Sequence, residues 1–168
     1  EQGILRYRGY PIEEIAANAR FSEVSYMLIY GERAESKELA TFKQELTQHT
    51  LLHEDMKKFF EGYPPNAHPM AIMAAMMASL STFYPGSEDE VDLNIIRLLA
   101  KAKTIAAFAH KKSVGQPFIY PQNNLSYPGN FLRMMFAVPS EPYVVHPVLE
   151  EALNLLLILH ADHEQNCS

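Results

Sequence analysis

The sequence predicts an all-α fold, because helical periodicity runs along most of the chain whereas strand periodicity is almost missing. Apolar residues recur every three or four positions in about eight segments. Proline and glycine separate these segments, for example at Gly62–Pro65 and at Pro85–Gly86. The one alternating stretch, Gly3–Tyr10, predicts a short extended segment that Gly9 and Pro11 end. We therefore expect helices packed on helices.

The first two helices are predicted at residues 11–19 and 23–30. Pro11 suits the first turn of a helix, where its missing N–H costs nothing. Ser22 is a good N-cap for the second helix, and Gly31 supplies its stop.

Three more helices are predicted at residues 37–50, 54–61 and 69–84. The first carries few apolar residues on a charged surface, so we expect it to lie on the outside. The third is rich in methionine and alanine, which indicates a packed core helix rather than a ligand groove.

The second half of the chain predicts helices at residues 91–112 and 131–136 and a last helix from Pro147. Between the first two lies the irregular stretch Ser113–Pro128, with three prolines and two asparagines. A long irregular stretch in a compact domain usually serves function or assembly.

Length and composition set broad limits. The 168 residues fit one domain, and a hydrophobic content of 48% with 20% charged residues is typical of globular proteins. The net charge of -6 argues against a nucleic-acid surface, because binding to phosphates needs clustered Lys and Arg. Neither nucleic acid nor a membrane is expected as a partner, since Leu155–Leu159 is far shorter than a membrane span.

The single cysteine, Cys167, excludes an internal disulfide framework and agrees with a reducing compartment. No signal segment opens the chain, so we expect a cytoplasmic protein. The chain begins at Glu1 rather than at a methionine and stops at Ser168, directly after its most polar segment. We interpret it as an internal fragment.

The last helix is apolar on nearly every face between Val148 and Leu159, so we expect a buried core element surrounded by other helices. It is followed by the string H-A-D-H-E-Q-N at residues 160–166. If the helix continues, residues three and four apart share a face, so that His160 faces His163 and Glu164. A buried imidazolium there would bind an anion.

Two other interpretations of these histidines stay open. Both could be core or interface residues that only satisfy hydrogen bonds. Metal binding is not expected, because helical zinc sites of the H-E-x-x-H type place the histidines four apart, whereas His160 and His163 are three apart.

The string H-A-D-H-E-Q-N closely resembles the motif of citrate synthases, most of all bacterial ones. Further matches are H-P-M at His68–Met70 and S-V-G-Q-P-F-I-Y-P at Ser113–Pro121. Two longer matches are G-I-L-R-Y-R-G-Y-P-I-E-E at Gly3–Glu14 and L-S-Y-P-G-N-F-L-R-M-M-F at Leu125–Phe136. The resemblance implies an incomplete, multi-helical large domain of the citrate synthase fold. Residues 1–168 would form its N-terminal part, with the small domain and the rest of the large domain absent.

The resemblance implies an acyltransferase that condenses acetyl-CoA with oxaloacetate, giving citrate and CoA at the entry to the tricarboxylic acid cycle. His163 would contact oxaloacetate and His160 would line the pocket. The family's catalytic aspartate, its further catalytic histidines and its carboxylate-binding arginines follow the motif, so no catalytic residue is expected within this stretch. Acetyl-CoA is a co-substrate and no cofactor is implied. A homodimer or higher homo-oligomer is expected.

Some bacterial citrate synthases bind NADH at a separate allosteric site on the large domain. The residues that match this site are His49, Thr50, Tyr84, Arg97 and Lys101. Two positions depart from it, since Gln48 stands where that type has arginine and Ser140 where it can have cysteine. The alternative is that Arg97 and Lys101, four residues apart, form one solvated helix face.

Two alternative functions remain. A 2-methylcitrate synthase would use propionyl-CoA. An enzyme discriminates between two substrates that differ by one methylene group by only about 10- to 200-fold, which leaves little trace in a sequence. A non-catalytic helical interaction module is the other alternative, and in that case the natural chain would end near Ser168.

Overall fold

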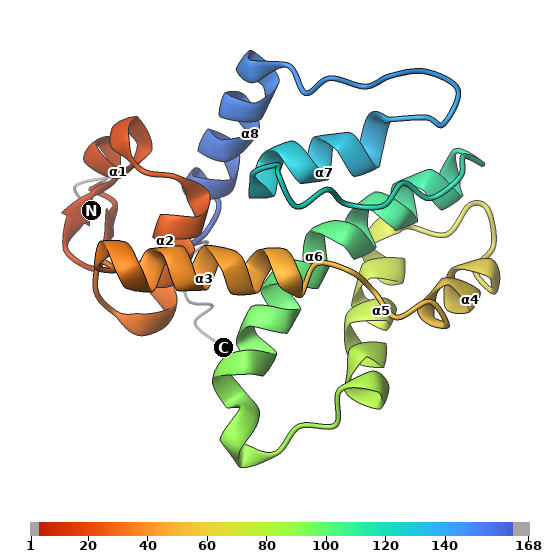
Figure 1. Cartoon of the computed structure of the whole chain (residues 1–168), viewed down its shortest axis with the longest axis horizontal. Helices are drawn as coiled ribbons and strands as arrows, with labels where there is room; N and C mark the ends of the chain where they lie inside the picture. The colour runs from red at the N-terminus through yellow and green to blue at the C-terminus, as the bar shows by residue number, and fades with distance from the viewer. Residues whose placement is uncertain (1–3, 163–168) are drawn as a thin grey trace. The chain divides into compact units, whose positions relative to one another are not determined.

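The computed structural model describes residues 4–162, apart from the side chain of Glu88. The described part holds eight α-helices, a short 3-10 helix and one hairpin of two very short strands (Figure 1), so the predicted all-α class is confirmed. In chain order the elements are β1 Arg6–Tyr7, β2 Tyr10–Pro11, α1 Ile12–Asn18, α2 Phe21–Tyr30, α3 Ser36–Gln48, α4 Met56–Glu61, α5 Pro69–Phe83, η1 Glu88–Glu90, α6 Val91–Ser113, α7 Tyr127–Phe136 and α8 Pro147–Leu159.

The chain forms two compact units. The first unit combines Glu1–Lys43 with His146–Ser168, and the second unit is Gln44–Val145. The boundary falls inside α3, whose surface is mostly exposed as predicted. Within the described residues no helix is long and apolar enough to cross a membrane.

In the first unit α8 packs against α1 and α2. The core of this unit consists of Tyr7, Ile15, Val24, Met27 and Ile158. The extended segment predicted near the N-terminus is present as a hairpin, in which Arg6 pairs with Pro11 and Tyr7 with Tyr10.

The turn of this hairpin explains how two such short strands form. Its central residues, Arg8 and Gly9, have φ angles of 50° and 89°. Positive φ at both central positions is the pattern of the type I′ turn, whose twist matches that of the strands, and glycine adopts it without strain.

In the second unit α5 and α6 lie side by side, and α7 packs on α6 (Figure 1). The helix predicted at residues 69–84 is the core helix α5, which buries Ile72, Met76 and Leu80. These residues belong to a cluster with aromatic and aliphatic side chains of α4 and α6, among them Phe60, Ile105 and Phe108.

Several predicted boundaries differ from the observed ones, and capping explains two of them. The second helix begins at Phe21 rather than after Ser22, because the Glu23 carboxylate accepts a hydrogen bond from the Arg20 N–H at 3.3 Å and stabilises an earlier first turn. α7 begins at Tyr127, because the Ser126 hydroxyl accepts the Gly129 N–H at 3.0 Å. Residues 114–126 therefore form the irregular stretch.

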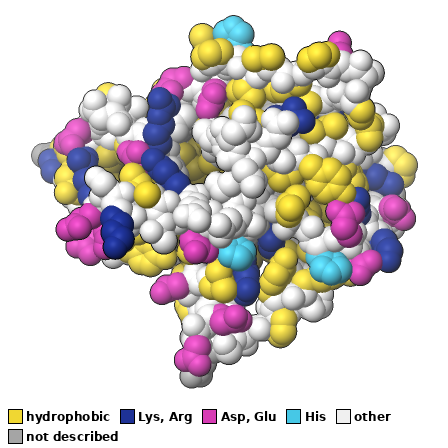
Figure 2. Space-filling view, in the orientation of Figure 1, with side chains coloured by type: hydrophobic (Ala, Val, Ile, Leu, Met, Phe, Trp, Pro, Cys, Tyr) yellow, Lys and Arg dark blue, Asp and Glu magenta, His cyan; other side chains and the backbone are white. Residues whose placement is uncertain are grey.

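The prediction that the last helix is surrounded by other helices is wrong for the described residues. α8 buries only Asn154 and Ile158, whereas Val148, Leu149 and Leu156 are 68%, 54% and 52% exposed. α1 and α2 pack on one side, and no described residue buries these other apolar positions. Figure 2 shows apolar side chains, in yellow, reaching the surface of the molecule.

Candidate functional site

The end of α8 is the first candidate site. The helix stops at Leu159, and His160 leaves it with φ -104° and ψ 6°. The His160 Nδ1 lies 2.8 Å from the Leu156 carbonyl oxygen, which also accepts the His160 backbone N–H at 3.1 Å. The helix does not continue through residues 160–162, so the condition for the predicted shared helix face is not met in that segment. His163 and Glu164 lie outside the described residues.

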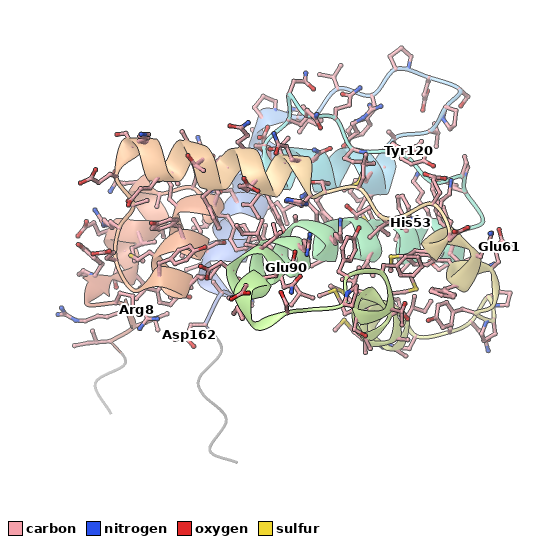
Figure 3. The ribbon with its side chains drawn as sticks, turned by 60° about the horizontal axis from the view of Figure 1, so that its bottom comes forward. Arg8, His53, Glu61, Glu90, Tyr120 and Asp162 are labelled. Carbon is pink, nitrogen blue, oxygen red and sulfur yellow. The ribbon has the colours of Figure 1, made fainter. Side chains whose placement is uncertain are left out.

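Tyr7 of β1 holds this end of α8. Its side chain is 1% exposed, and its hydroxyl donates a hydrogen bond to the Ile158 carbonyl at 2.8 Å. The Tyr7 hydroxyl oxygen also accepts a hydrogen bond from the backbone N–H of Asp162 at 3.3 Å. In Figure 3, Asp162 follows the end of α8 on the side where Arg8 and the hairpin lie. The last carbonyls of a helix have no partner within the helix, and Tyr7 supplies one.

Asn154 fixes α8 at a second point. The residue is 1% exposed, and its Oδ1 accepts the backbone N–H of Phe21 at 2.9 Å while its Nδ2 donates to the Ala19 carbonyl at 3.4 Å. Both partners belong to the junction between α1 and α2. Because buried amides need hydrogen-bond partners, this pairing defines the position of α8 along its axis.

The second candidate site is the α6 cation cluster, which we define as Arg97, Lys101 and Lys103 with Tyr84 and residues 49–51. The Lys101 ammonium donates to the carbonyls of His49 and Leu51 at 2.7 and 2.5 Å. Both Lys101 and Arg97 place their charged groups 4.9 Å from the centre of the Tyr84 ring. The structure thus brings together the residues proposed from the sequence for allosteric binding.

Thr50 completes the cluster from its buried end. It is 2% exposed, and its hydroxyl accepts a hydrogen bond from the Lys103 ammonium at 2.9 Å. Its carbonyl accepts the Thr104 hydroxyl at 2.8 Å. Side chains of α6 therefore bind three successive carbonyls, those of residues 49, 50 and 51.

Burial controls the charge state of the two lysines. Desolvation, with a smaller contribution from Arg97, lowers the pKa of Lys101 to about 8. Desolvation, with a smaller contribution from Lys101, lowers the pKa of Lys103 to about 7. Neither ammonium has a carboxylate partner among the contacts of the described residues, whereas Arg97 has Glu90 at 3.7 Å.

The alternative of a solvated face formed by Arg97 and Lys101 is wrong. Lys101 is 2% exposed, and the side chain of Arg97 is 17% exposed. Lys103 and Thr104 were missed by sequence reasoning, although the lysines of K-A-K-T inside an apolar helix were a usable signal.

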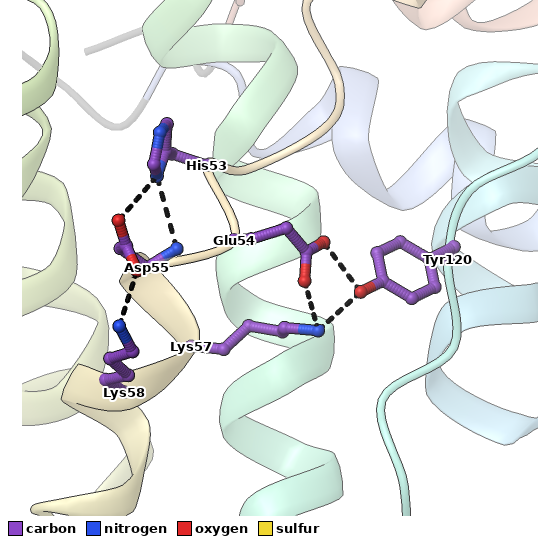
Figure 4. Close-up of polar contacts among 6 residues, drawn as sticks. All are labelled: His53, Glu54, Asp55, Lys57, Lys58 and Tyr120. Carbon is purple, nitrogen blue, oxygen red and sulfur yellow. Dashed lines mark hydrogen bonds and ion pairs between the residues drawn. The ribbon is translucent and has the colours of Figure 1, made fainter.

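A third polar group ties the irregular stretch to α4 (Figure 4). The Lys57 ammonium lies 2.5 Å from Glu54 Oε2 and donates to the Tyr120 hydroxyl at 2.5 Å. The Tyr120 hydroxyl donates to Glu54 Oε1 at 2.7 Å. The hydrogen bond from Lys57 lowers the pKa of Glu54, and the bond to Glu54 raises the pKa of Lys57. These exposed contacts position the loop around Tyr120.

His53, Asp55 and Lys58 form a neighbouring exposed group in Figure 4, with Lys58 donating to Asp55 at 2.6 Å. Across residues 4–162 no three His, Cys, Asp or Glu side chains are arranged to hold a metal ion. Most of the H-A-D-H-E-Q-N string lies beyond that range.

The fold matches those of solved citrate synthases. A structure from Pyrobaculum aerophilum has a TM-score of 0.82 and 32% sequence identity, and it matches over 97% of this chain and 42% of that one. The Thermoplasma acidophilum enzyme, solved with carboxymethyl coenzyme A and oxaloacetate, has a TM-score of 0.87, with 99% of this chain and 43% of that one covered. Its identity of 23% supports similarity of fold alone. The chain is thus part of a helical enzyme fold of this class.

The sequence comparisons identify the family. The family model described as citrate synthase, C-terminal domain, matches residues 1–168. Citrate synthase 1 of Mycobacterium tuberculosis is 53% identical and citrate synthase of Corynebacterium glutamicum 51% identical, each over the whole of this chain. The chain therefore belongs to the citrate synthase family. It spans 40% of the length of these two relatives.

Proposed function

We propose that the protein containing this chain condenses acetyl-CoA with oxaloacetate to form citrate and CoA. The observation that carries the proposal is the H-A-D-H-E-Q-N string directly after α8, in a chain that matches the citrate synthase family over its whole length. The curated relatives from Mycobacterium tuberculosis and Corynebacterium glutamicum, both named citrate synthases, support the substrate class. The chain would contribute helices of the large domain and one side of the oxaloacetate pocket.

In the proposed reaction a base removes a methyl proton from the thioester, and the enolate is stabilised by a hydrogen bond. The nucleophilic carbon attacks the carbonyl of oxaloacetate, and water then cleaves the thioester and releases CoA. The base and the carboxylate-binding arginines would come from segments that follow the motif. The roles proposed for this chain are oxaloacetate binding by His163 and lining of the pocket by His160.

The geometry of His160 supports its role as a lining residue. A carbonyl oxygen can only accept a hydrogen bond, so the short contact with Leu156 places a proton on Nδ1. The ring is exposed at the end of α8, and its Nε2 is the nitrogen that remains for a ligand. An imidazole held in this way offers one defined atom to the pocket.

Release of the CoA thiol tests the function directly. The full-length protein should release CoA from acetyl-CoA only when oxaloacetate is present, and the polypeptide of residues 1–168 alone should show no release above background. Faster turnover with propionyl-CoA would favour the 2-methylcitrate synthase alternative. No turnover with either thioester would reject the enzyme proposal and favour the interaction module.

We also propose that the full-length protein is a homodimer or higher homo-oligomer. The apolar side chains that α8 leaves exposed support this, because contiguous exposed apolar surface usually marks an interface. Sedimentation velocity at several concentrations measures the state. A monomer at all concentrations would contradict the proposal.

A second candidate function is regulation by NADH at the α6 cation cluster. It is supported by the assembly of Arg97 and Lys101 around the ring of Tyr84, since an anionic ligand with an aromatic base fits such a group. Lys101 is already bound to two carbonyls, so Arg97 and the partly exposed His49 are the proposed contacts.

NADH titration of citrate formation tests this regulation. Arg97→Gln should abolish inhibition while leaving turnover unchanged, and Lys112→Gln, on the same helix, should keep it. A wild-type enzyme without inhibition would reject the regulatory proposal and leave the catalytic one intact.

A further inference from the structure

One oxygen atom connects the end of α8 to the backbone that leaves it. The Tyr7 hydroxyl donates to the Ile158 carbonyl at 2.8 Å and accepts the Asp162 N–H at 3.3 Å. Its distance to the Leu159 carbonyl is 3.5 Å. Two backbone groups on either side of His160 and Ala161 are therefore joined through a side chain that is distant in sequence.

The hydroxyl is itself held rigidly. The Tyr7 ring is 1% exposed and packs with Ile15, Val24, Met27 and Ile158. The residue belongs to a hairpin closed by a tight turn at Arg8 and Gly9. A hydroxyl on a packed ring and a short, closed backbone has little freedom, which is what a group that orients a site requires.

We propose that Tyr7 is a positioning residue for oxaloacetate binding. By fixing the path of the chain from Ile158 to Asp162, its hydroxyl holds the segment that carries His160. This inference rests on the proposed function, in which His160 lines the oxaloacetate pocket. Tyr7 touches no reacting atom and acts through the backbone.

Because Asn154 also holds α8, we expect loss of the Tyr7 hydroxyl to affect only the end of that helix. Its two hydrogen bonds to the junction between α1 and α2 are independent of Tyr7 and hold the middle of α8. Loss of the Tyr7 hydroxyl alone therefore leaves the helix docked and releases only its last turn and the residues up to Asp162. The expected consequence is weaker substrate binding in a folded enzyme.

The alternative is that Tyr7 only supplies a hydrogen bond to a helix carbonyl and has a purely structural role. Tyr127 offers a matched control for this alternative. Its hydroxyl donates to the Leu99 carbonyl of α6, also at 2.8 Å, and the residue is half-buried. Each Tyr→Phe change removes one hydroxyl bound to a helix carbonyl and keeps the ring.

The test compares Tyr7→Phe with Tyr127→Phe in the full-length enzyme, at a temperature well below both melting transitions. Tyr7→Phe should raise the oxaloacetate KM by about three- to tenfold, the effect of losing one neutral hydrogen bond. Its KM for acetyl-CoA should stay within about twofold, because the change affects one pocket only. Tyr127→Phe should change neither KM, even if it lowers the melting temperature similarly.

Unchanged oxaloacetate KM in Tyr7→Phe would overturn the positioning role. An equal rise of both KM values in both variants would do the same, since that pattern indicates general loosening. An inactive wild-type enzyme would instead reject the proposed function, so the two failures are distinguishable.

Hydrogen exchange on the wild-type full-length protein gives a second test that needs no variant. Oxaloacetate should slow amide exchange in peptides that cover residues 158–162 and also in the hairpin at residues 4–11, which makes no proposed contact with substrate. Protection at the end of α8 without any change in the hairpin would contradict the coupling through Tyr7.

Discussion

The burial of side chains in α6 and α8 is the reverse of what the amino-acid compositions of the two helices predict. α6 carries four lysines and buries three of them, Lys101, Lys103 and Lys111. α8 has no basic residue within its bounds and is almost entirely apolar, yet it buries only Asn154 and Ile158. Burial in this chain is therefore decided by what packs around a helix and not by the hydrophobicity of the helix.

The partners of the buried lysines explain how α6 tolerates them. Lys101 and Lys103 reach carbonyls and a hydroxyl, and Lys111 donates to the Ala137 carbonyl and to Gln116 Oε1, both at 2.6 Å. Carbonyl dipoles offset part of the desolvation cost of an ammonium, although less well than a carboxylate does. α8 lacks an equivalent set of neighbours among the described residues, so its apolar faces remain at the surface.

The largest expected effect concerns the exposed side of α8. The isolated chain of residues 1–168 should self-associate, because Leu149 and Leu156 lie seven residues apart on one face and are about half exposed. Changing both to Gln should shift the sedimentation profile towards the monomer. Val91 and Leu98 of α6 have the same spacing and similar exposure, so the same change there is the control. A parent chain that is monomeric at every concentration would refute this prediction.

A smaller effect is expected from a buried lysine of α6. Lys111→Ala leaves the Ala137 carbonyl without its ammonium donor, at a cost of about 2 kcal/mol in the free energy of unfolding. Thermal unfolding of the full-length protein measures the change. Lys112→Ala, one residue further, should cost less than about 0.5 kcal/mol. Equal effects of the two changes would show that burial of Lys111 does not matter.

The smallest effect is a pH dependence from Lys103. Its pKa of about 7 in the folded chain lies below the ordinary value of 10.5, so the unfolded chain binds more protons between these values. Stability should therefore rise with pH above about 7, by about 1 kcal/mol between pH 7 and pH 8. Lys103→Met should remove that rise, whereas Lys58→Met, at an exposed position, should leave it unchanged. Parallel plots of the free energy of unfolding against pH for wild type and Lys103→Met would contradict the assignment of this pH dependence to Lys103.

Local patterns were sufficient to predict the fold class and most of the helices. Gly31 ends α2 with a φ of 91°, as a glycine C-cap should, and α5 begins with Pro69 in its first turn. The wrong starts predicted for α2 and α7 depend on side-chain caps at Glu23 and Ser126 that compete with equally plausible neighbours. The exposure of α8 could not be predicted, because periodicity shows which faces are apolar but not which neighbours cover them.

The sites were predictable only in part, for a related reason. The polar string after α8 and the residues around Tyr84 stand out through their types or their resemblance to a family. Tyr7 does not, because its partner Ile158 is 151 residues away and no local pattern connects them. Asn154 was a usable signal, since a lone amide within an apolar helix needs a buried partner.

The most direct test of the central claim is His163→Gln in the full-length enzyme. If His163 hydrogen-bonds oxaloacetate in a pocket with little water, its loss should raise the oxaloacetate KM by roughly tenfold or more. The melting temperature should stay nearly unchanged, because the amide keeps part of the hydrogen bonding. A lower melting temperature together with an unchanged oxaloacetate KM would show that His163 is a structural histidine and would contradict the placement of the substrate pocket at the end of α8.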